Sequence, residues 1–233
     1  MDHRDAENKV PWYYVPMDRA PTEPLGFDDL VAAHRAQHAG IMGLPALVRR
    51  MLARCAEHVA AFPGRRSSTV TWLTAGLAVG VLLLGLSGAP AWAWAAFAGW
   101  AVLVTPPVYF LQGYVRTVDG RPFERFLLPN GLTWFRLVLA PLAAWPLLLD
   151  NALPQAVRVA ALVALPLFDF LDGQIARRCH LESRLGRMLD PTADLALMGW
   201  LSTGLYLDGT LPWLAYAIIM VRYPGTVLNG LLV

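Results

Sequence analysis

The longest uncharged stretch of the chain runs from Ser67 to Val115, without a single Asp, Glu, Lys or Arg. A helix needs about 20 mostly apolar residues to cross a bilayer. The stretch therefore has room for two spans, which we predict at 69–87 and 91–111. Burial in a soluble all-α protein does not explain a pair of segments this long and this uniformly apolar.

The rest of the composition points the same way. Hydrophobic residues make up 56% of the chain and charged residues only 15%. Four further apolar segments follow the first pair, at 132–149, 154–179, 185–207 and 211–232. For each of these shorter segments, a buried helix of a soluble protein is the alternative. The prediction is an all-α, polytopic integral membrane helix bundle with about six transmembrane helices and an amino-terminal cytoplasmic segment.

Arginines mark one side of this predicted bundle. Lys and Arg in short loops stay on the cytoplasmic side of a membrane. The alternate loops at 87–90, 150–153 and 208–210 contain neither. The arginines lie before the first span, in the loop 112–128 and around the turn 177–187, as Arg65, Arg66, Arg116, Arg121, Arg125, Arg177, Arg178, Arg184 and Arg187. We therefore place the amino terminus and the turn 177–187 in the cytoplasm. The net charge of +2 is a topology signal and does not indicate nucleic-acid binding.

Residues 1–66 differ from the rest in composition. Prolines and aromatic residues between Val10 and Pro24 indicate irregular structure, and 27–61 is predicted to form one or two helices. Apolar residues at helical spacing near its end alternate with Arg49, Arg50 and Arg54. This pattern fits a surface helix against anionic lipid, with packing on the protein itself as the alternative. Cys55 and Cys179 both fall on the predicted cytoplasmic side, where disulfides are rare.

Four aspartates lie in an otherwise largely apolar part of the chain: Asp169, Asp172, Asp190 and Asp194. Carboxylates in or beside membrane helices are costly and mark functional sites. Helical geometry sets the first two on one helix face and the last two on one face of a following helix. Two such faces turned toward each other would surround one small volume with four carboxylates. This arrangement favours a divalent metal over a packed core.

The same residues carry a resemblance. The pattern Asp169-x-x-Asp172-Gly173-x-x-Ala176-Arg177, eight residues, Gly186-x-x-x-Asp190-x-x-x-Asp194 resembles the signature of the CDP-alcohol phosphotransferases, which are integral membrane enzymes that build phospholipid headgroups. The stretch from Pro129 to Arg136 is similar to the Pro-Asn-x-x-Thr-x-x-Arg opening of that family's first core helix. We therefore divide the chain into 1–66, a pair of additional helices with a basic loop at 67–127, and a family core at 128–233.

The resemblance implies a phosphatidyl transfer in phospholipid biosynthesis. A CDP-linked donor such as CDP-diacylglycerol would react with a small alcohol and release CMP. Asp169, Asp172, Asp190 and Asp194 would hold one or two Mg²⁺ or Mn²⁺ ions, and Asp194 would also be the general base. The family also implies a membrane-lipid environment and a homodimer, and we expect a multi-pass protein of a bacterial inner membrane with a cytoplasmic active site.

The resemblance further assigns binding residues. Nucleotide contacts would come from Gly173, Ala176, Arg177, Gly186, Asn130 and Thr133. Close helix packing is the alternative for the small residues, and a helix start with its cap is the alternative for Asn130 and Thr133. Arg136 and Arg222 would bind the acceptor, which points to glycerol 3-phosphate, although Arg222 could simply snorkel to the interface.

The chain departs from the family in one respect. The family core has six helices, and counting from Pro129 this sequence supplies four. We expect a core that is incomplete at its carboxyl end, unless the two leading spans take the place of the missing pair. A catalytically inactive or truncated relative acting as a membrane scaffold, and an ion-coupled transporter, are the alternative functions.

Overall fold

The computed structural model describes residues 32, 36, 44–117, 120–142, 144, 163, 167, 170–171 and 173–232. Across these ranges the regular structure is helical, apart from one isolated β-bridge between Arg116 and Pro122. The elements are α2 (Leu44–Ala61), α3 (Pro63–Leu86), α4 (Ala91–Phe110), the short η3 (Leu111–Tyr114), α5 (Leu128–Val138), α8 (Arg184–Leu207) and α9 (Trp213–Leu232). The all-α prediction is confirmed for this part of the chain.

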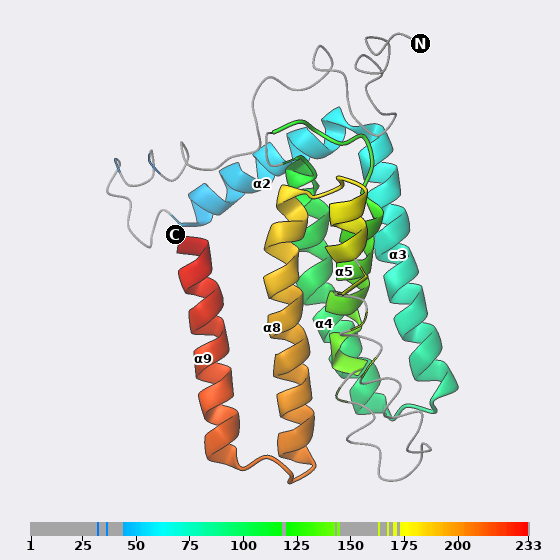
Figure 1. Cartoon of the computed structure of the whole chain (residues 1–233), viewed down its shortest axis with the longest axis vertical. Helices are drawn as coiled ribbons and strands as arrows, with labels where there is room; N and C mark the ends of the chain where they lie inside the picture. The colour runs from blue at the N-terminus through cyan, green and yellow to red at the C-terminus, as the bar shows by residue number, and fades with distance from the viewer. Residues whose placement is uncertain are drawn as a thin grey trace.

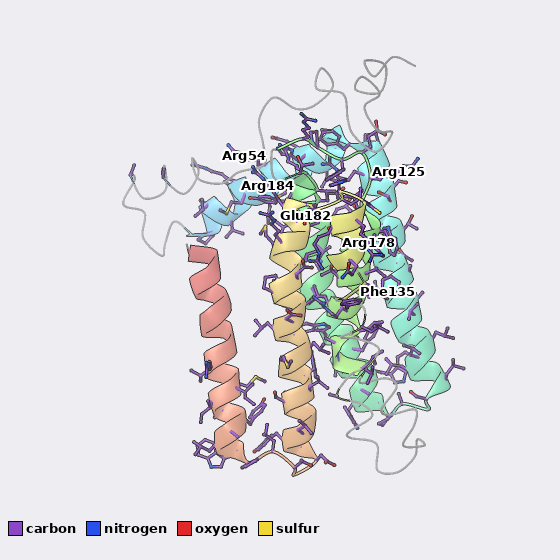
Figure 2. The ribbon with its side chains drawn as sticks, viewed as in Figure 1. Arg54, Arg125, Phe135, Arg178, Glu182 and Arg184 are labelled. Atoms are coloured by element: carbon purple, nitrogen blue, oxygen red, sulfur yellow. The ribbon has the colours of Figure 1, made fainter. Side chains whose placement is uncertain are left out.

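Helices α3, α4, α5, α8 and α9 run side by side, and α2 lies across one end of them (Figure 1). The α3–α4 and α8–α9 connections lie at the end opposite α2, whereas the described residues of the loop before α5 and the turn before α8 lie at the same end as α2. Figure 2 shows Arg54, Arg125, Arg178 and Arg184 together at the α2 end. The arginine-rich segments of the described chain therefore share one end of the bundle.

Two helices are long and apolar enough to cross a membrane, Pro63–Leu86 and Ala91–Tyr114. The core helix of a soluble protein would also pass such a test, but it would be mostly buried. Here only 28% and 17% of the apolar windows are buried, and Leu82, Leu86 and Val102 are exposed on their surfaces. These two helices support the interpretation that the chain is a membrane protein. The six-helix count stays a prediction, because most of 132–179 beyond α5 lies outside the described residues.

The first apolar helix begins at Pro63, six residues before the predicted start, because Arg65 is accommodated inside the fold. Its side chain is fully buried. The guanidinium donates through Nε to the Phe123 carbonyl at 2.9 Å and through Nη1 to the Gln112 carbonyl at 3.4 Å, and Nη2 also donates to Phe123. One turn later, Ser68 Oγ accepts the Phe126 N–H at 2.8 Å. The start of α3 thereby fixes the loop that leads into α5.

Helices α3 and α5 pack against each other through two reciprocal glycine–tryptophan contacts. A Cβ placed on Gly76 of α3 would lie 2.5 Å from Trp134 Nε1 of α5. A Cβ on Gly131 of α5 would lie 2.5 Å from the indole of Trp72 on α3. Each tryptophan therefore occupies the space that a glycine leaves on the other helix, which is the close packing that small residues allow between membrane helices.

We expect the Gly76→Ala variant to lose stability, because the added methyl group overlaps the Trp134 indole. Overpacking of this kind costs about 1–3 kcal/mol. Gly85→Ala on the same helix is the matched control, since nothing lies within 4 Å of its Cβ and alanine favours a helix over glycine by about 1 kcal/mol. Apparent unfolding temperatures in detergent should move in opposite directions. Equal shifts would show that the α3–α5 contact is loose.

His58, on the buried side of α2, gives the fold a pH dependence. Its side chain is 8% exposed, and its Nδ1 has no hydrogen-bond partner within the described structure. Burial, reinforced by the nearby charges of Arg116 and Arg65, lowers the pKa of His58 below its ordinary 6.5. The unfolded chain thus takes up a proton before the folded one does, so stability is full above pH 6.5 and falls as the pH drops below it.

The His58→Gln variant should therefore lose less stability than the wild type between pH 7 and pH 5, because glutamine has no proton to take up. Apparent unfolding temperatures measured across that range would test this. His180→Gln, in an exposed turn, is the control. A His58→Gln profile parallel to that of the wild type would contradict the prediction.

Candidate active site

A cavity of about 140 Å³ lies between the start of α5, the helical residues 173–178 and the first turns of α8. Its lining comes from two segments that are far apart in the sequence. The lining residues are Pro129, Asn130, Thr133, Gly173, Ala176, Arg177, Leu181, Glu182, Ser183, Gly186, Arg187 and Asp190. All six residues assigned to nucleotide binding, and Asp190 from the metal set, thus lie around one cavity.

Asp190 and Thr133 join α5 to α8 at this cavity. Helix α5 begins at Leu128 with a proline in its first turn, and Thr133 lies one turn further on. The Thr133 Oγ1 lies 3.0 Å from Asp190 Oδ1 and 3.0 Å from the Pro129 carbonyl, and its single proton can serve either acceptor. The hydroxyl can therefore hold one oxygen of the Asp190 carboxylate in place at the cavity wall.

Ser183 organises the wall between the two motifs. It is the N-cap of α8, and its Oγ accepts the Gly186 N–H at 2.9 Å. Because the Oγ accepts there, its own proton is donated to Asn130 Oδ1 at 2.8 Å. This fixes the amide of Asn130, whose Nδ2 is buried and has no hydrogen-bond partner in the described part of the chain. An unpaired buried donor is costly, so Asn130 presents an N–H that a ligand acceptor would satisfy.

The two glycines of the signature make room for polar side chains. A Cβ on Gly186 would lie 3.0 Å from Asn130 Oδ1 and 3.3 Å from Ser183 Oγ. A Cβ on Gly173 would lie 3.3 Å from Arg177 Nη2. The small residues were predicted to let a nucleotide approach or helices pack closely. Here the absence of a side chain lets an amide, a hydroxyl and a guanidinium occupy the cavity wall.

The helix that carries Arg177 ends in a left-handed turn. His180 has a φ of 54°. The Leu181 N–H donates to the Ala176 carbonyl at 2.9 Å, and the His180 N–H donates to the Arg177 carbonyl at 3.5 Å. This is the Schellman pattern of a helix end. It turns the chain so that Leu181, Glu182 and Ser183 close the cavity before α8 begins.

The mouth of the cavity carries charges of both signs. Arg177 and Arg187 contribute guanidinium groups, and Glu182 contributes a carboxylate. Arg187 Nη2 lies 3.7 Å from Glu182 Oε2, with both side chains about half exposed or more. Such a solvated pair contributes little stability, so Arg187 can exchange this partner for a phosphate.

Asp194 lies one helical turn beyond Asp190 and pairs with a buried arginine. Arg136 Nη2 lies 3.2 Å from Asp194 Oδ1, and the same nitrogen donates to the Asp190 carbonyl at 3.3 Å. The Arg136 side chain is fully buried, whereas that of Asp194 is 56% exposed. The Arg136–Asp194 pair adjoins the cavity but does not line it. Arg136 was predicted to bind the acceptor, and here it contacts the predicted general base.

Three predicted residues remain, of which the structure describes one, Arg222. Arg222 is exposed on α9 and does not line the cavity. Asp169 and Asp172 lie outside the described residues. Among the residues that are described, no three acidic, His or Cys side chains gather closely enough to hold a metal ion.

The carboxylates that are described fit a hard divalent cation. Asp190 would offer an oxygen ligand at the cavity, oriented by Thr133, and Asp194 follows on the same face of α8. Carboxylate oxygens are the ligands that Mg²⁺ and Mn²⁺ take in proteins. The donor set is therefore chemically suitable as far as it is described.

Residues 126–233 match the sequence model of the CDP-alcohol phosphatidyltransferase family. The match includes α5, α8, α9 and every residue that lines the cavity. The recognition based on the aspartate signature is therefore confirmed for this part of the chain, which matches the family model.

Similar curated proteins cover only part of the chain. A CDP-diacylglycerol–glycerol-3-phosphate 3-phosphatidyltransferase of Aquifex aeolicus is 43% identical over 67 residues, which are 29% of this chain and 36% of that protein. A probable phosphatidylglycerophosphate synthase of Mycobacterium tuberculosis is 34% identical over 101 residues, 42% of this chain and 48% of that protein. A cardiolipin synthase (CMP-forming) and mitochondrial hydrolase fusion protein of Schizosaccharomyces pombe is 35% identical over 118 residues, 48% of this chain and 19% of that protein. The chain thus spans less than half the length of these relatives, and no solved structure matches it.

Proposed function

We propose that this chain transfers a phosphatidyl group from a CDP-linked donor, such as CDP-diacylglycerol, to glycerol 3-phosphate and releases CMP. One observation carries the proposal: residues of the Pro129–Arg136 motif and residues of the aspartate signature, although far apart in sequence, line one cavity at the basic end of the bundle. The family match at 126–233 supports the reaction class. The names of the Aquifex and Mycobacterium relatives support the acceptor.

In this reaction the acceptor hydroxyl oxygen attacks the phosphorus that carries the diacylglycerol. The bond from that phosphorus to the CMP oxygen breaks, CMP leaves, and the hydroxyl proton passes to a base. Asp194 would accept this proton, because its carboxylate is half exposed and is held in place by Arg136. Arg136 acts here as a positioning residue for Asp194.

The donor would be held by the cavity wall. The buried Nδ2 of Asn130 would donate to an oxygen or nitrogen of the nucleotide. Arg177 and Arg187 would pair with its phosphates through their planar guanidinium groups. Asp169, Asp172, Asp190 and Asp194 would hold one or two Mg²⁺ or Mn²⁺ ions, which stabilise the attacking and leaving oxygens when bound.

We further propose that the end of the bundle beneath α2 faces the cytoplasm of a bacterial cell. The arginines of the described loops gather at that end (Figure 2), and basic loop residues stay on the cytoplasmic side. The cavity would then open where water-soluble acceptors and CMP are available.

The proposal is tested by CMP release from the purified full chain in lipid vesicles. The vesicles would contain CDP-diacylglycerol and Mg²⁺ or Mn²⁺, and the acceptors would be added one at a time. We expect release with glycerol 3-phosphate and none with serine, inositol or inositol phosphate. Release only with phosphatidylglycerol would favour a lipid acceptor instead, the second candidate that the name of the Schizosaccharomyces relative raises.

The two non-enzymatic alternatives predict different outcomes of the same assay. A folded chain that binds CDP but releases no CMP with any acceptor would indicate an inactive scaffold. An ion-coupled transporter would carry cations across the vesicle membrane, with flux lost in Asp190→Asn. Either result would overturn the enzymatic proposal.

A further inference from the structure

Helix α2 carries an apolar stripe that continues beyond the protein surface it packs on. Val48, Leu52, Cys55 and Val59 follow one another at intervals of three or four, with Met51 next to Leu52, and they therefore lie on one face of the helix. An apolar stripe of this kind normally packs against one apolar environment along its whole length.

The two halves of the stripe have different partners. Cys55 is 3% exposed and Val59 is 6% exposed, against η3 and the neighbouring long helices. Val48 and Leu52 are each 45% exposed, and both are large apolar side chains. Within the described structure, the bundle covers only the carboxy-terminal half of α2.

Charge distinguishes the uncovered half as well. Arg49 is exposed on one side of the stripe, about 100° around the helix from Val48, and the half-buried Arg54 lies on the other side, about 120° from Val48. The first acidic residue of α2 is Glu57, on the covered half. An apolar face flanked by arginines and free of carboxylates matches the boundary of an anionic bilayer, where acyl chains meet lipid phosphates.

The position of α2 in the fold fits the same surrounding. It crosses the ends of α3 and α4 (Figure 1), the two helices that are long and apolar enough to span a membrane and that are mostly unburied. It lies at the arginine-rich end of the bundle (Figure 2). A helix in that position lies at the level where the apolar surface of the two spans stops and the lipid headgroups begin.

We propose that the amino-terminal half of α2, residues 44–54, lies in the headgroup layer of an anionic membrane. Val48 and Leu52 enter the acyl boundary, and the guanidinium group of Arg49 binds lipid phosphate. Membrane contact of this kind is separate from the transfer reaction, and it holds whether or not the chain releases CMP.

Site-directed spin labelling of the full chain tests the proposal. The exposed Cys179 is first replaced by serine, and the buried Cys55 is left in place. Labels are then attached through Val48→Cys, Leu52→Cys and Ala53→Cys. Ala53 is exposed and lies about 140° around the helix from Val48, so it is the matched control on the water-facing side. The chain is reconstituted in bilayers of phosphatidylcholine with or without phosphatidylglycerol.

Two relaxing agents read the depth of each label: lipid-soluble oxygen and a water-soluble nickel chelate. In bilayers with phosphatidylglycerol, labels at 48 and 52 should collide severalfold more with oxygen than with the chelate, and the label at 53 should show the reverse. Replacing Arg49 by glutamine should weaken this difference, and so should removing phosphatidylglycerol.

Two outcomes would overturn the proposal. Equal access of the nickel chelate to all three labels would place the helix in water. Protection of the labels at 48 and 52 from both agents would show that protein, either another segment or a second copy, covers the stripe. An unchanged elution profile of each labelled chain guards against unfolding as the cause.

Discussion

Replacing Asp194 by asparagine is expected to lower the rate of CMP release by about 10²–10⁴-fold, the usual contribution of a general base. Asparagine keeps the shape of the side chain but cannot accept the acceptor's proton. The fold should tolerate the change, because the Asp194 side chain is 56% exposed. Initial rates at saturating donor and acceptor would show the loss in kcat.

Asp208→Asn is the matched control for this variant. Asp208 caps the far end of the same helix, is exposed and accepts the Thr210 hydroxyl at 2.7 Å. It should keep the wild-type rate. An Asp194→Asn variant with near-normal kcat would remove Asp194 as the base and leave it as a partner of Arg136. A wild-type chain without activity would instead count against the proposed reaction itself.

Replacing Gly186 by alanine is expected to weaken binding of the donor by about 5–150-fold. The added Cβ would lie 3.0 Å from Asn130 Oδ1 and 3.3 Å from Ser183 Oγ. The amide and the hydroxyl must therefore both move away from the new methyl group. Disturbing a buried hydrogen bond costs about 1–3 kcal/mol, which corresponds to that change in affinity. The measurement is the binding of CDP by calorimetry together with the KM for CDP-diacylglycerol.

Gly199→Ala separates this effect from a general change in α8. Gly199 lies on the same helix, and nothing lies within 4 Å of its Cβ. Alanine there should leave donor binding unchanged and raise stability by up to about 1 kcal/mol. Equal donor binding in the two variants would show that the Ser183–Asn130–Gly186 contacts do not shape the donor site.

Local patterns in the sequence predicted where several of the candidate site residues lie. The four-residue spacing of Gly186, Asp190 and Asp194 predicted a helix with these residues on one face, and all three lie on α8. The match to two family motifs predicted that Asn130 and Thr133 lie near the aspartate signature. The structure places both beside Asp190 or Gly186.

Contacts between distant segments were not predictable in the same way. Ser183 stands in the variable stretch of the signature, and only its position three residues before Gly186 marks it as a helix cap. The pairing of Arg136 with Asp194 depends on the register of α5 against α8, which neither helix reveals alone. Arg65 was interpreted only as a topology signal. Its burial was not predictable, because the carbonyl groups that it binds lie 47 and 58 residues further along the chain.

The reciprocal contacts between α3 and α5 have a consequence for how such a protein can be divided. The recognised family stretch begins at residue 126, yet Gly131 within it is filled by Trp72 from before it, and Trp134 projects back onto Gly76. Removing the residues before 126 would leave the space beside Gly131 empty, and it would remove the glycine against which the Trp134 indole packs. A substitution on either side would therefore call for a compensating one on the other. The stretch that matches the family model and the stretch that packs together are therefore not the same length of chain.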